Sequence, residues 1–295
     1  MSIEVGVLYV VATPIGNLGD MSPRAVQVLS SVDYIAAEDT RRSKRLLQHF
    51  GIHKPLISLH EHNEHYRVPQ LLAHLLAGGS MALVSDAGTP LISDPGYQLV
   101  RSLRERGIKV VPIPGPSSLL AALSVAGLPT DRFIFEGFLP AKSSARLKRL
   151  ESLKGYKYTL VFFEASHRIQ ASLSDMAVVL GEERQAVVAR ELTKLFEEIQ
   201  GGSLNELCQW IAADKKRCLG EFVVIVQGAP EQAEPVSEDP LCRLLKVLLE
   251  ELPIKQAVKV AANFTHLSKN NLYELALEIS SKKRSLHVHL GKEKL

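Results

Sequence analysis

The sequence predicts an α/β fold of two successive α/β domains, followed by a small all-α domain of helix-turn-helix type. Over the first 230 residues, short apolar runs rich in β-branched residues alternate with amphipathic segments, which is the pattern of strands alternating with helices. Loops rich in glycine and proline follow three of these runs, and after residue 240 only helical periodicity remains. We therefore expect domains at residues 1–118, 119–230 and 241–285.

The first domain is expected to hold a mostly parallel sheet. Its strands are predicted at residues 5–12, 32–37, 55–60, 81–85 and 109–113, because continuous apolar runs of this length are typical of buried parallel strands. Ser22 is a good N-cap and Pro23 suits a first helical turn, so a helix begins there. Further helices are predicted at residues 43–50, 68–77, 97–106 and 117–126, and most of them end at a glycine.

The second domain repeats the alternation, and the third departs from it. Strands are predicted at residues 133–137, 158–164, 185–190 and 221–227, with helices at 143–153, 167–180 and 204–213. Residues 228–240 are rich in proline and acidic residues and are typical of a linker. Helices at 241–251, 254–263 and 269–280, with a tight turn at 264–268, fit a helix-turn-helix-like module. A plain helical cap or dimerisation element is the alternative.

Charge is unevenly distributed along the chain. The 295 residues carry a net charge of +3, but residues 241–295 hold 10 basic and 5 acidic residues, against 25 and 27 in the first 240. A basic end on a near-neutral body indicates contact with a polyanion, or a solvated tail that aids solubility. The three cysteines form no CxxC, and no signal peptide or long apolar span is present. We expect a cytoplasmic protein without disulfides or membrane helices.

Three Gly/Pro-rich loops are the main candidate for a binding site. They cover residues 13–19, 86–96 and 114–118, each after a predicted strand. In open parallel sheets, ligands bind outside the carboxyl ends of the strands. Such loops offer many backbone carbonyls, which suit amino, hydroxyl and sulfonium groups better than phosphate. The sequence lacks GxxxxGK[ST], and it lacks GxGxxG after the first strand, so neither a P-loop nor a dinucleotide site is indicated.

The motifs ATPIGNLGDMSPRA, AEDTRRS, VSDAGTPLISDPG, IPGPSS, FFEASHR and ARELTKLFEE occur in this order. Over about residues 5–230 the chain resembles the tetrapyrrole-methylase superfamily, and most closely the branch that methylates a cytidine ribose 2′-hydroxyl in small-subunit ribosomal RNA. The helical module resembles the domain appended in that branch. The resemblance implies a homodimer with S-adenosylmethionine in a cleft between two α/β domains. It also implies 16S rRNA as the partner, within the 30S subunit, and cytidine 1402 of the decoding centre as the target.

The resemblance assigns cofactor contacts residue by residue, mostly through the backbone. The implied positions lie in the three loops, on one strand of the second domain and near the adenine: Pro14, Asp86, Ala87, Gly88, Ser93, Ser117, Ser118, Phe162, Phe163, Leu192 and Ala229.

Methylation of a hydroxyl calls for a base or a charge stabiliser, because the hydroxyl has a high pKa. We predict Lys194 or Glu191 as proton acceptor or its orienting group, with Glu38 and Arg41 as further candidates. A surface ion pair is the alternative for Lys194. The predicted RNA contacts are basic residues of the EDTRRS and FFEASHR motifs, of helix 143–153 and of the helical module: Arg41, Arg42, Arg168, Lys148, Arg149 and Lys269. For helix 143–153, a solvated face is the alternative.

Other readings of the chain remain open. His60, His62 and His65 do not have the spacing of a zinc site, so no metal is expected. A methylase acting on a tetrapyrrole carbon shares the same fold and cofactor, but a small macrocycle requires no basic helical appendage. A ligand-sensing regulator that binds duplex DNA is the third possibility. Helix 269–280 has Lys269, Asn270 and Asn271 at its start but little else that suits the reading of base edges, which disfavours this possibility.

Overall fold

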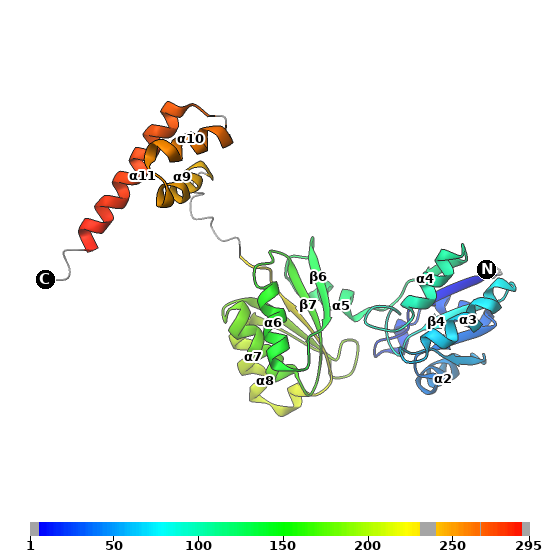
Figure 1. Cartoon of the computed structure of the whole chain (residues 1–295). Coiled ribbons are helices and arrows are strands. Elements are labelled where there is room, and N and C mark those ends of the chain that lie inside the picture. Colours follow the sequence, from blue (N-terminus) through cyan, green and yellow to red (C-terminus); the bar gives the residue numbers. More distant parts are fainter. Residues whose placement is uncertain (1–5, 231–239, 266, 291–295) are drawn as a thin grey trace. The chain divides into compact units, whose positions relative to one another are not determined.

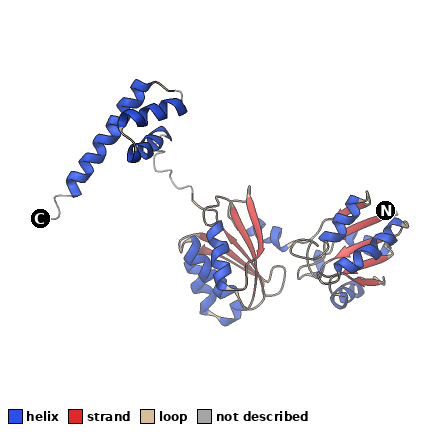
Figure 2. Cartoon of the chain, viewed as in Figure 1, coloured by secondary structure: helices blue, strands red, loops and turns tan. Residues whose placement is uncertain are grey.

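The computed structural model describes residues 6–230, 240–265 and 267–290, and side chains up to Ile279. The chain forms two compact units, Met1–Ala229 and Pro230–Leu295 (Figure 1). The first unit contains two sheets, one formed by β1 to β5, within residues 7–113, and the other by β6 to β10, within residues 133–226 (Figure 2). Most of the predicted linker, residues 231–239, lies outside the described residues, as does His266 in the predicted turn.

The first sheet consists of five parallel strands in the order β3-β2-β4-β1-β5. Their bounds are β1 Val7–Val11, β2 Tyr34–Ala37, β3 Leu56–Ser58, β4 Ser80–Val84 and β5 Lys109–Ile113. Because all strands run in one direction, the segments that follow them emerge at the same edge of the sheet. The predicted parallel sheet is confirmed.

Helices cover both faces of this sheet. On one face, α1 (Pro23–Ser31) and α2 (Thr40–His49) contribute Leu29 and Leu47 to a buried cluster. On the other, α3 (Glu64–Leu76) and α4 (Tyr97–Glu105) contribute Leu75 and Leu99. The Ser22 side chain accepts a hydrogen bond from the Ala25 N–H at 3.1 Å, so the predicted cap of α1 is confirmed.

The second sheet has the order β6-β7-β10-β8-β9 and is mixed. Only β6 and β7 are parallel; the pairs β7–β10, β10–β8 and β8–β9 are antiparallel. The strand bounds are β6 Phe133–Phe138, β7 Thr159–Ala165, β8 Gln185–Arg190, β9 Glu198–Ser203 and β10 Glu221–Val226. Strand β9 was not predicted, because EIQGGS is polar and glycine-rich and lies at the sheet edge.

The faces of the second sheet are covered unequally. Helices α6 (Ser143–Leu153), α7 (Ile169–Leu180) and α8 (Leu204–Ala213) lie on one face, over a large apolar core (Figure 1). The other face packs against α5 (Ser118–Val125) and a smaller cluster that includes Ile15 and Leu192. Single 3₁₀ turns, η1 (Leu18–Asp20) and η2 (Lys215–Cys218), lie in connecting segments.

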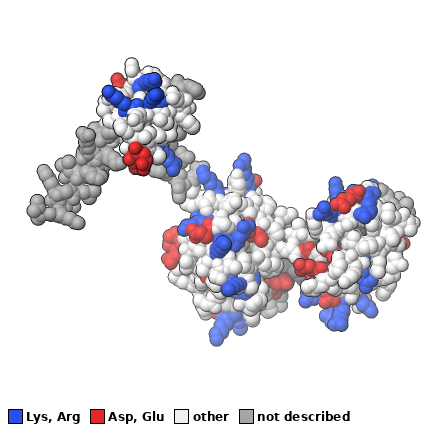
Figure 3. Space-filling model, in the orientation of Figure 1, with Lys and Arg blue, Asp and Glu red and all other residues white. Residues whose placement is uncertain are grey.

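The second unit contains α9 (Pro240–Glu251), α10 (Ile254–Thr265) and α11 (Lys269–Leu290), packed around Leu245, Ala261 and Leu272. Helix α11 extends ten residues beyond its predicted end. Lys and Arg side chains gather over the part of this unit that holds α10 (Figure 3). In the described part of the chain, no helix combines the length and apolar character needed to cross a membrane.

Candidate functional site

The three Gly/Pro-rich loops meet at the carboxyl edge of the first sheet. Thr13 and Gly88 form an isolated β-bridge, with N···O distances of 2.9 and 3.0 Å. The Thr89 hydroxyl donates to the Pro116 carbonyl at 3.0 Å and joins the second loop to the third. The predicted convergence of the three loops is confirmed.

Gly88 occupies a position that suits only glycine. Its φ of 81° lies in the left-handed region, and a Cβ built there falls 3.3 Å from Ile15 Cγ2. A side chain at this position is therefore strained and crowds the first loop. The backbone at Gly88 stays open to close approach.

A cavity of about 450 Å³ lies against these loops and draws its walls from both sheets of the first unit. One wall is apolar and consists of Ile15, Phe163, Ala189, Leu192 and Val223. A second wall is acidic and consists of Glu38, Asp86 and Asp94, which follow β2 and β4 of the parallel sheet. The cavity thus offers an apolar surface and an acidic one to a single ligand.

The acidic wall is partly shielded from solvent. Asp86 accepts hydrogen bonds from the Asp39 N–H and from the Arg42 guanidinium, both at 3.0 Å. Burial raises the pKa of Glu38, and the charges of Asp94 and Asp86 raise it further. Burial also raises the pKa of Asp94, with a smaller contribution from Asp86 and an opposing hydrogen bond from Ser85. Glu38 and Asp94 are therefore stronger bases than exposed carboxylates.

Asp94 follows a strained turn. Leu91 and Ser93 adopt φ values of 72° and 67°, in the left-handed region that non-glycine residues rarely occupy. Residues held in this way cluster at ligand sites, where the surrounding structure fixes them. The turn therefore fixes the backbone from which the Asp94 side chain projects at the cavity wall.

Most of the predicted cofactor contacts lie together. The cavity lining includes Asp86, Ala87, Gly88, Ser93, Ser117, Ser118, Phe163 and Leu192. Pro14 is half-buried between two residues of the same loop and does not itself line the cavity.

Phe162 and Ala229 do not line the cavity, and as cofactor contacts they stay predictions. Side chains alternate between the faces of a strand, so Phe162 points away from Phe163 and is fully buried in the core under α6 and α7. Strand β10 begins at Glu221, which lines the cavity, and ends at Val226. Ala229 follows the far end of the strand, where its N–H donates to the Tyr156 carbonyl at 2.7 Å.

Lys194 and Glu191 form an ion-pair network at the edge of the site, outside the cavity lining. Lys194 Nζ lies 2.8 Å from Glu191 Oε1 and 2.8 Å from Glu221 Oε2. Burial tends to lower the pKa of Lys194, but the two carboxylates outweigh it and raise that pKa. Burial likewise tends to raise the pKa of Glu191, but Lys194 and the Glu221 N–H lower it. This ion-paired geometry fits the second of the two predicted roles, that of an orienting group, and both roles stay predictions.

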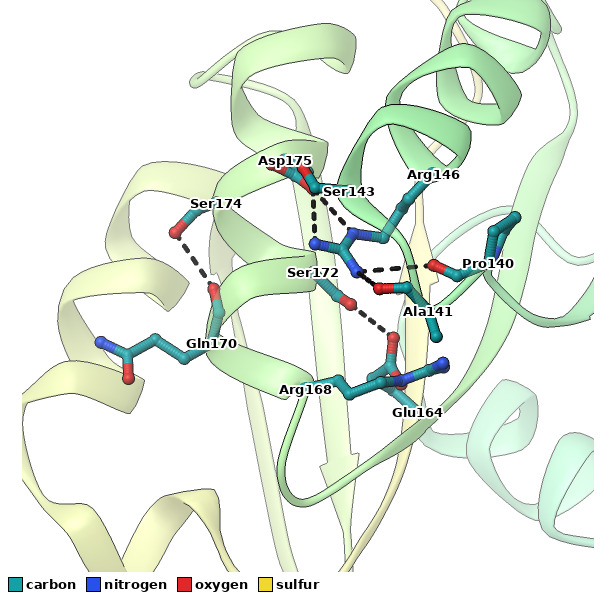
Figure 4. A network of polar contacts seen from close by, with 10 residues as sticks. All are labelled: Pro140, Ala141, Ser143, Arg146, Glu164, Arg168, Gln170, Ser172, Ser174 and Asp175. Carbon is teal, nitrogen blue, oxygen red and sulfur yellow. Dashed lines mark hydrogen bonds and ion pairs between the residues drawn. The ribbon is translucent and has the colours of Figure 1, made fainter.

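Several predicted RNA contacts are engaged within the protein. Arg149 pairs with Glu136 through two hydrogen bonds of 2.8 and 2.9 Å. Arg168 pairs with the buried Glu164 (Figure 4). Arg42 is 69% exposed although it contacts Asp86. The others, Arg41, Lys148 and Lys269, are exposed.

One of the basic side chains of helix α6 stabilises the fold and does not add positive charge to the surface. Arg146 is buried and pairs with Asp175 at 2.7 Å, while its other nitrogen donates to the carbonyls of Pro140 and Ala141 (Figure 4). The functional interpretation of helix 143–153 as a basic wall therefore rests on Lys148 and the half-engaged Arg149.

Sequence reasoning missed Asp94, Phe138 and Glu221, which line the cavity. Asp94 had a signal, because Ser-Asp-x-Gly occurs twice, at Asp86 and again at Asp94. Phe138 packs edge-on to Phe163 with ring centroids 5.7 Å apart, a contact that no local pattern indicates. Among the described residues, no His, Cys, Asp and Glu side chains gather in a group that could hold a metal ion.

Comparisons with known proteins agree with this geometry. Residues 7–208 match the family of tetrapyrrole (corrin/porphyrin) methylases, and residues 234–280 match the RsmI C-terminal HTH domain. The chain is 54% identical over 282 residues to a ribosomal RNA small subunit methyltransferase I of Pseudomonas aeruginosa, covering 95% of this chain and 100% of that one. It is 54% identical over 273 residues to the protein of that name in Escherichia coli O157:H7, covering 92% and 95%.

A likeness to solved structures supports the fold. The crystal structure of a cobalt precorrin-4 methyltransferase superposes with a TM-score of 0.55 at 17% identity, covering 75% of this chain and 95% of that one. With loops, cavity and full-length similarity in agreement, the chain belongs to the tetrapyrrole (corrin/porphyrin) methylase family, in the group of the ribosomal RNA small subunit methyltransferases I.

Proposed function

We propose that the protein transfers a methyl group from S-adenosylmethionine to the ribose 2′-hydroxyl of a cytidine in 16S ribosomal RNA, at position 1402 of the decoding centre. One observation carries the proposal: the similarity to methyltransferases of small-subunit ribosomal RNA extends at 54% identity through both units of the chain. The motifs quoted above support the ribose hydroxyl and this cytidine as the target.

The cavity has the size and chemistry for S-adenosylmethionine. Its volume of about 450 Å³ falls in the range of pockets for ligands of this size. Ile15, Leu192 and Val223 offer an apolar surface for an adenine ring. Glu38, Asp86 and Asp94 offer negative charge to an ammonium and a sulfonium group. When bound, the cofactor supplies a methyl group activated by the sulfonium.

The protein's own residues have two tasks in this reaction. The first is to hold the hydroxyl in line with the bond that breaks, since alignment alone gives a large part of such a rate. The second is to receive the hydroxyl proton. We assign this task to Asp94, because it lines the cavity, follows a fixed turn and has a raised pKa. Glu38, which lies on the same acidic wall, balances the positive charge of the cofactor.

We further propose that the protein acts as a cytoplasmic homodimer on 16S rRNA within the 30S subunit. The family motifs support the dimer, and the exposed basic residues of the helical unit support contact with a polyanion. A tetrapyrrole C-methyltransferase shares the sheet architecture, but that likeness concerns the fold alone.

The test is methyl transfer from labelled S-adenosylmethionine, offered separately to naked 16S rRNA, intact 30S subunits and a tetrapyrrole. A 2′-O-methyl group blocks alkaline cleavage at its own position, so a labelled, alkali-resistant dinucleotide that begins at cytidine 1402 is the expected product. Label at another nucleotide overturns the target. Label in the macrocycle favours the tetrapyrrole methylase, and retention of duplex DNA without any transfer favours a regulator.

A further inference from the structure

Two loops of the second sheet meet beside the cavity, and one arginine joins them. Residues 191–197 connect β8 to β9, and residues 214–220 precede β10. Leu192 of the first loop and Gly220 of the second line the cavity. The Arg190 guanidinium donates to the carbonyls of Leu219 at 2.7 Å, Lys216 at 3.1 Å and Phe196 at 3.3 Å. Arg190 therefore fixes both loops to each other.

The loop 191–197 is held in one shape by several further contacts. Glu191 and Thr193 have φ values of 50° and 66°, which only a well-supported backbone keeps. The Thr193 N–H donates to the Glu197 carboxylate at 2.6 Å. Lys194 bridges Glu191 and Glu221 as described above. The side chains at the tip of the loop are thus presented by a pre-formed support.

These loops present apolar side chains to solvent. Leu195 is 90% exposed, Phe196 is 67% exposed and Leu219 is 60% exposed. Single exposed apolar residues are common on proteins, but these lie on two loops that Arg190 holds together next to the site. We call Leu195, Phe196, Lys215, Lys216 and Leu219 the rim.

The polar part of the rim is positive. Lys215 and Lys216 are exposed, and in the described part of the chain no ion pair joins either to a carboxylate. The nearby carboxylates are engaged elsewhere. Glu197 accepts the Thr193 N–H, Glu198 faces Arg190 at 3.4 Å, and Asp214 accepts the Lys216 N–H at 2.8 Å.

We propose that the rim binds an unpaired segment of the RNA substrate, with Phe196 stacked on a base and Lys215 and Lys216 on phosphates. This inference rests on the function proposed above. A nucleotide that brings its 2′-hydroxyl into a cavity must leave its stacked neighbours, and an aromatic side chain replaces the lost stacking. Free lysines beside it neutralise the backbone.

The same residues fit a second copy of this chain less well. In a two-fold symmetric contact both copies present the same patch, so a contact through the rim would gather Lys215 and Lys216 of both copies in one interface. Like charges that meet without a partner oppose such a contact. Nucleic acid instead supplies both the flat apolar surface and the negative charge.

The experiment uses the full chain with 30S subunits and measures kcat and KM for the RNA, the Kd for S-adenosylmethionine and the molar mass in solution. Phe196→Ala is expected to raise KM about tenfold, with donor affinity and molar mass unchanged; Phe196→Tyr keeps the ring and restores KM. Lys215→Gln with Lys216→Gln is expected to raise KM and to flatten its dependence on salt. Val178→Ala and Lys154→Gln change exposed residues of α7 and the end of α6 and serve as matched controls.

The outcomes separate cleanly. An unchanged KM in both rim variants overturns the inference while wild-type methylation of RNA still supports the proposed function. A fall in molar mass on Phe196→Ala assigns the rim to a subunit contact and overturns the inference as well. Wild-type protein that transfers no methyl group to RNA overturns the proposed function itself.

Discussion

The Glu164 carboxylate accepts a hydrogen bond from Arg168 Nε at 2.8 Å and forms an ion pair with Arg168 Nη2 at 2.6 Å, although the Glu164 side chain is only 1% exposed (Figure 4). The same carboxylate accepts hydrogen bonds from the Ala165 N–H and the Ser172 hydroxyl. Three residues thus hold this carboxylate, at a residue that also lines the cavity. A buried charge is tolerated here because an opposite charge and hydrogen-bond donors surround it.

Removal of Arg168 is therefore expected to be more harmful than removal of the whole pair. Arg168→Met leaves an unpaired buried carboxylate and is expected to lower the free energy of unfolding by about 3–5 kcal/mol. The double variant with Glu164→Gln removes the charge as well and recovers part of that loss. Urea unfolding of both variants checks this, and equal losses would contradict it.

Gly88→Ala is expected to weaken the binding of S-adenosylmethionine at least tenfold, since the new Cβ presses on Ile15 at the cavity. Gly107→Ala is a matched control, because Gly107 also has a positive φ, of 69°, but no atom lies within 4 Å of its Cβ position. Both changes cost about 1 kcal/mol of backbone strain. Calorimetric titration separates them, and an equal loss of donor affinity would remove Gly88 from the site.

The pH dependence of kcat is expected to report Asp94. A carboxylate accepts a proton only when it is ionised, so kcat rises with pH through the pKa of Asp94. Burial raises that pKa, and the rise therefore lies above the ordinary aspartate value of about 3.9. Asp94→Asn is expected to lower kcat about 100-fold and to abolish the rise. If Glu38→Gln removes the rise instead, the proton acceptor is Glu38.

Lys194→Met is expected to destabilise the protein mainly at neutral pH. The lowered pKa of Glu191 gives stability that is full above the ordinary glutamate range and is lost as pH falls through the folded-state pKa. Without Lys194 the pKa of Glu191 rises, so the difference in the free energy of unfolding between variant and wild type shrinks at acid pH. Thermal unfolding as a function of pH measures it. A pH-independent difference would argue against the ion-pair network as its origin.

Truncation after Ala229 is expected to leave S-adenosylmethionine binding intact, because the cavity lies wholly within the unit Met1–Ala229. The affinity for 30S subunits is expected to fall about tenfold or more with the loss of the exposed lysines of the helical unit. Calorimetry and filter binding measure the two affinities. A truncated protein that folds but no longer binds the donor would show that the helical unit contributes to the site.

Much of the fold was predictable because several elements in and around the two sheets follow local sequence rules. Strand β5 and helix α6 match their predicted bounds, and Ser22 caps α1 as expected. Helix α2 begins at Thr40 instead of Ser43, because Asp39 accepts the Arg41 N–H at 2.8 Å and starts the helix earlier. A capping aspartate can thus start a helix ahead of a basic run.

The site was predictable in its loops but not in its charges. Glycine and proline residues mark the three loops along the sequence, so the meeting of these loops was predictable, whereas Gly88 and Ser117 as cofactor contacts came from the family resemblance and stay predictions. The state of Lys194 depends on Glu221, which lies 27 residues away along the chain, and that of Arg168 depends on the burial of Glu164. Periodicity and motif spacing carry no information about such partners.

The mixed second sheet has a consequence for how substrate choice could change. Strands β8 and β10 are antiparallel neighbours, so the end of β8 lies beside the start of β10. The loop after Arg190 and the loop before Glu221 are therefore neighbours. The donor loops belong to the other, parallel sheet. Grafting the outer parts of both loops from a relative with a different acceptor, with Arg190 and the cavity-lining Leu192 and Gly220 kept, is expected to change the acceptor while the donor loops of the parallel sheet stay unchanged.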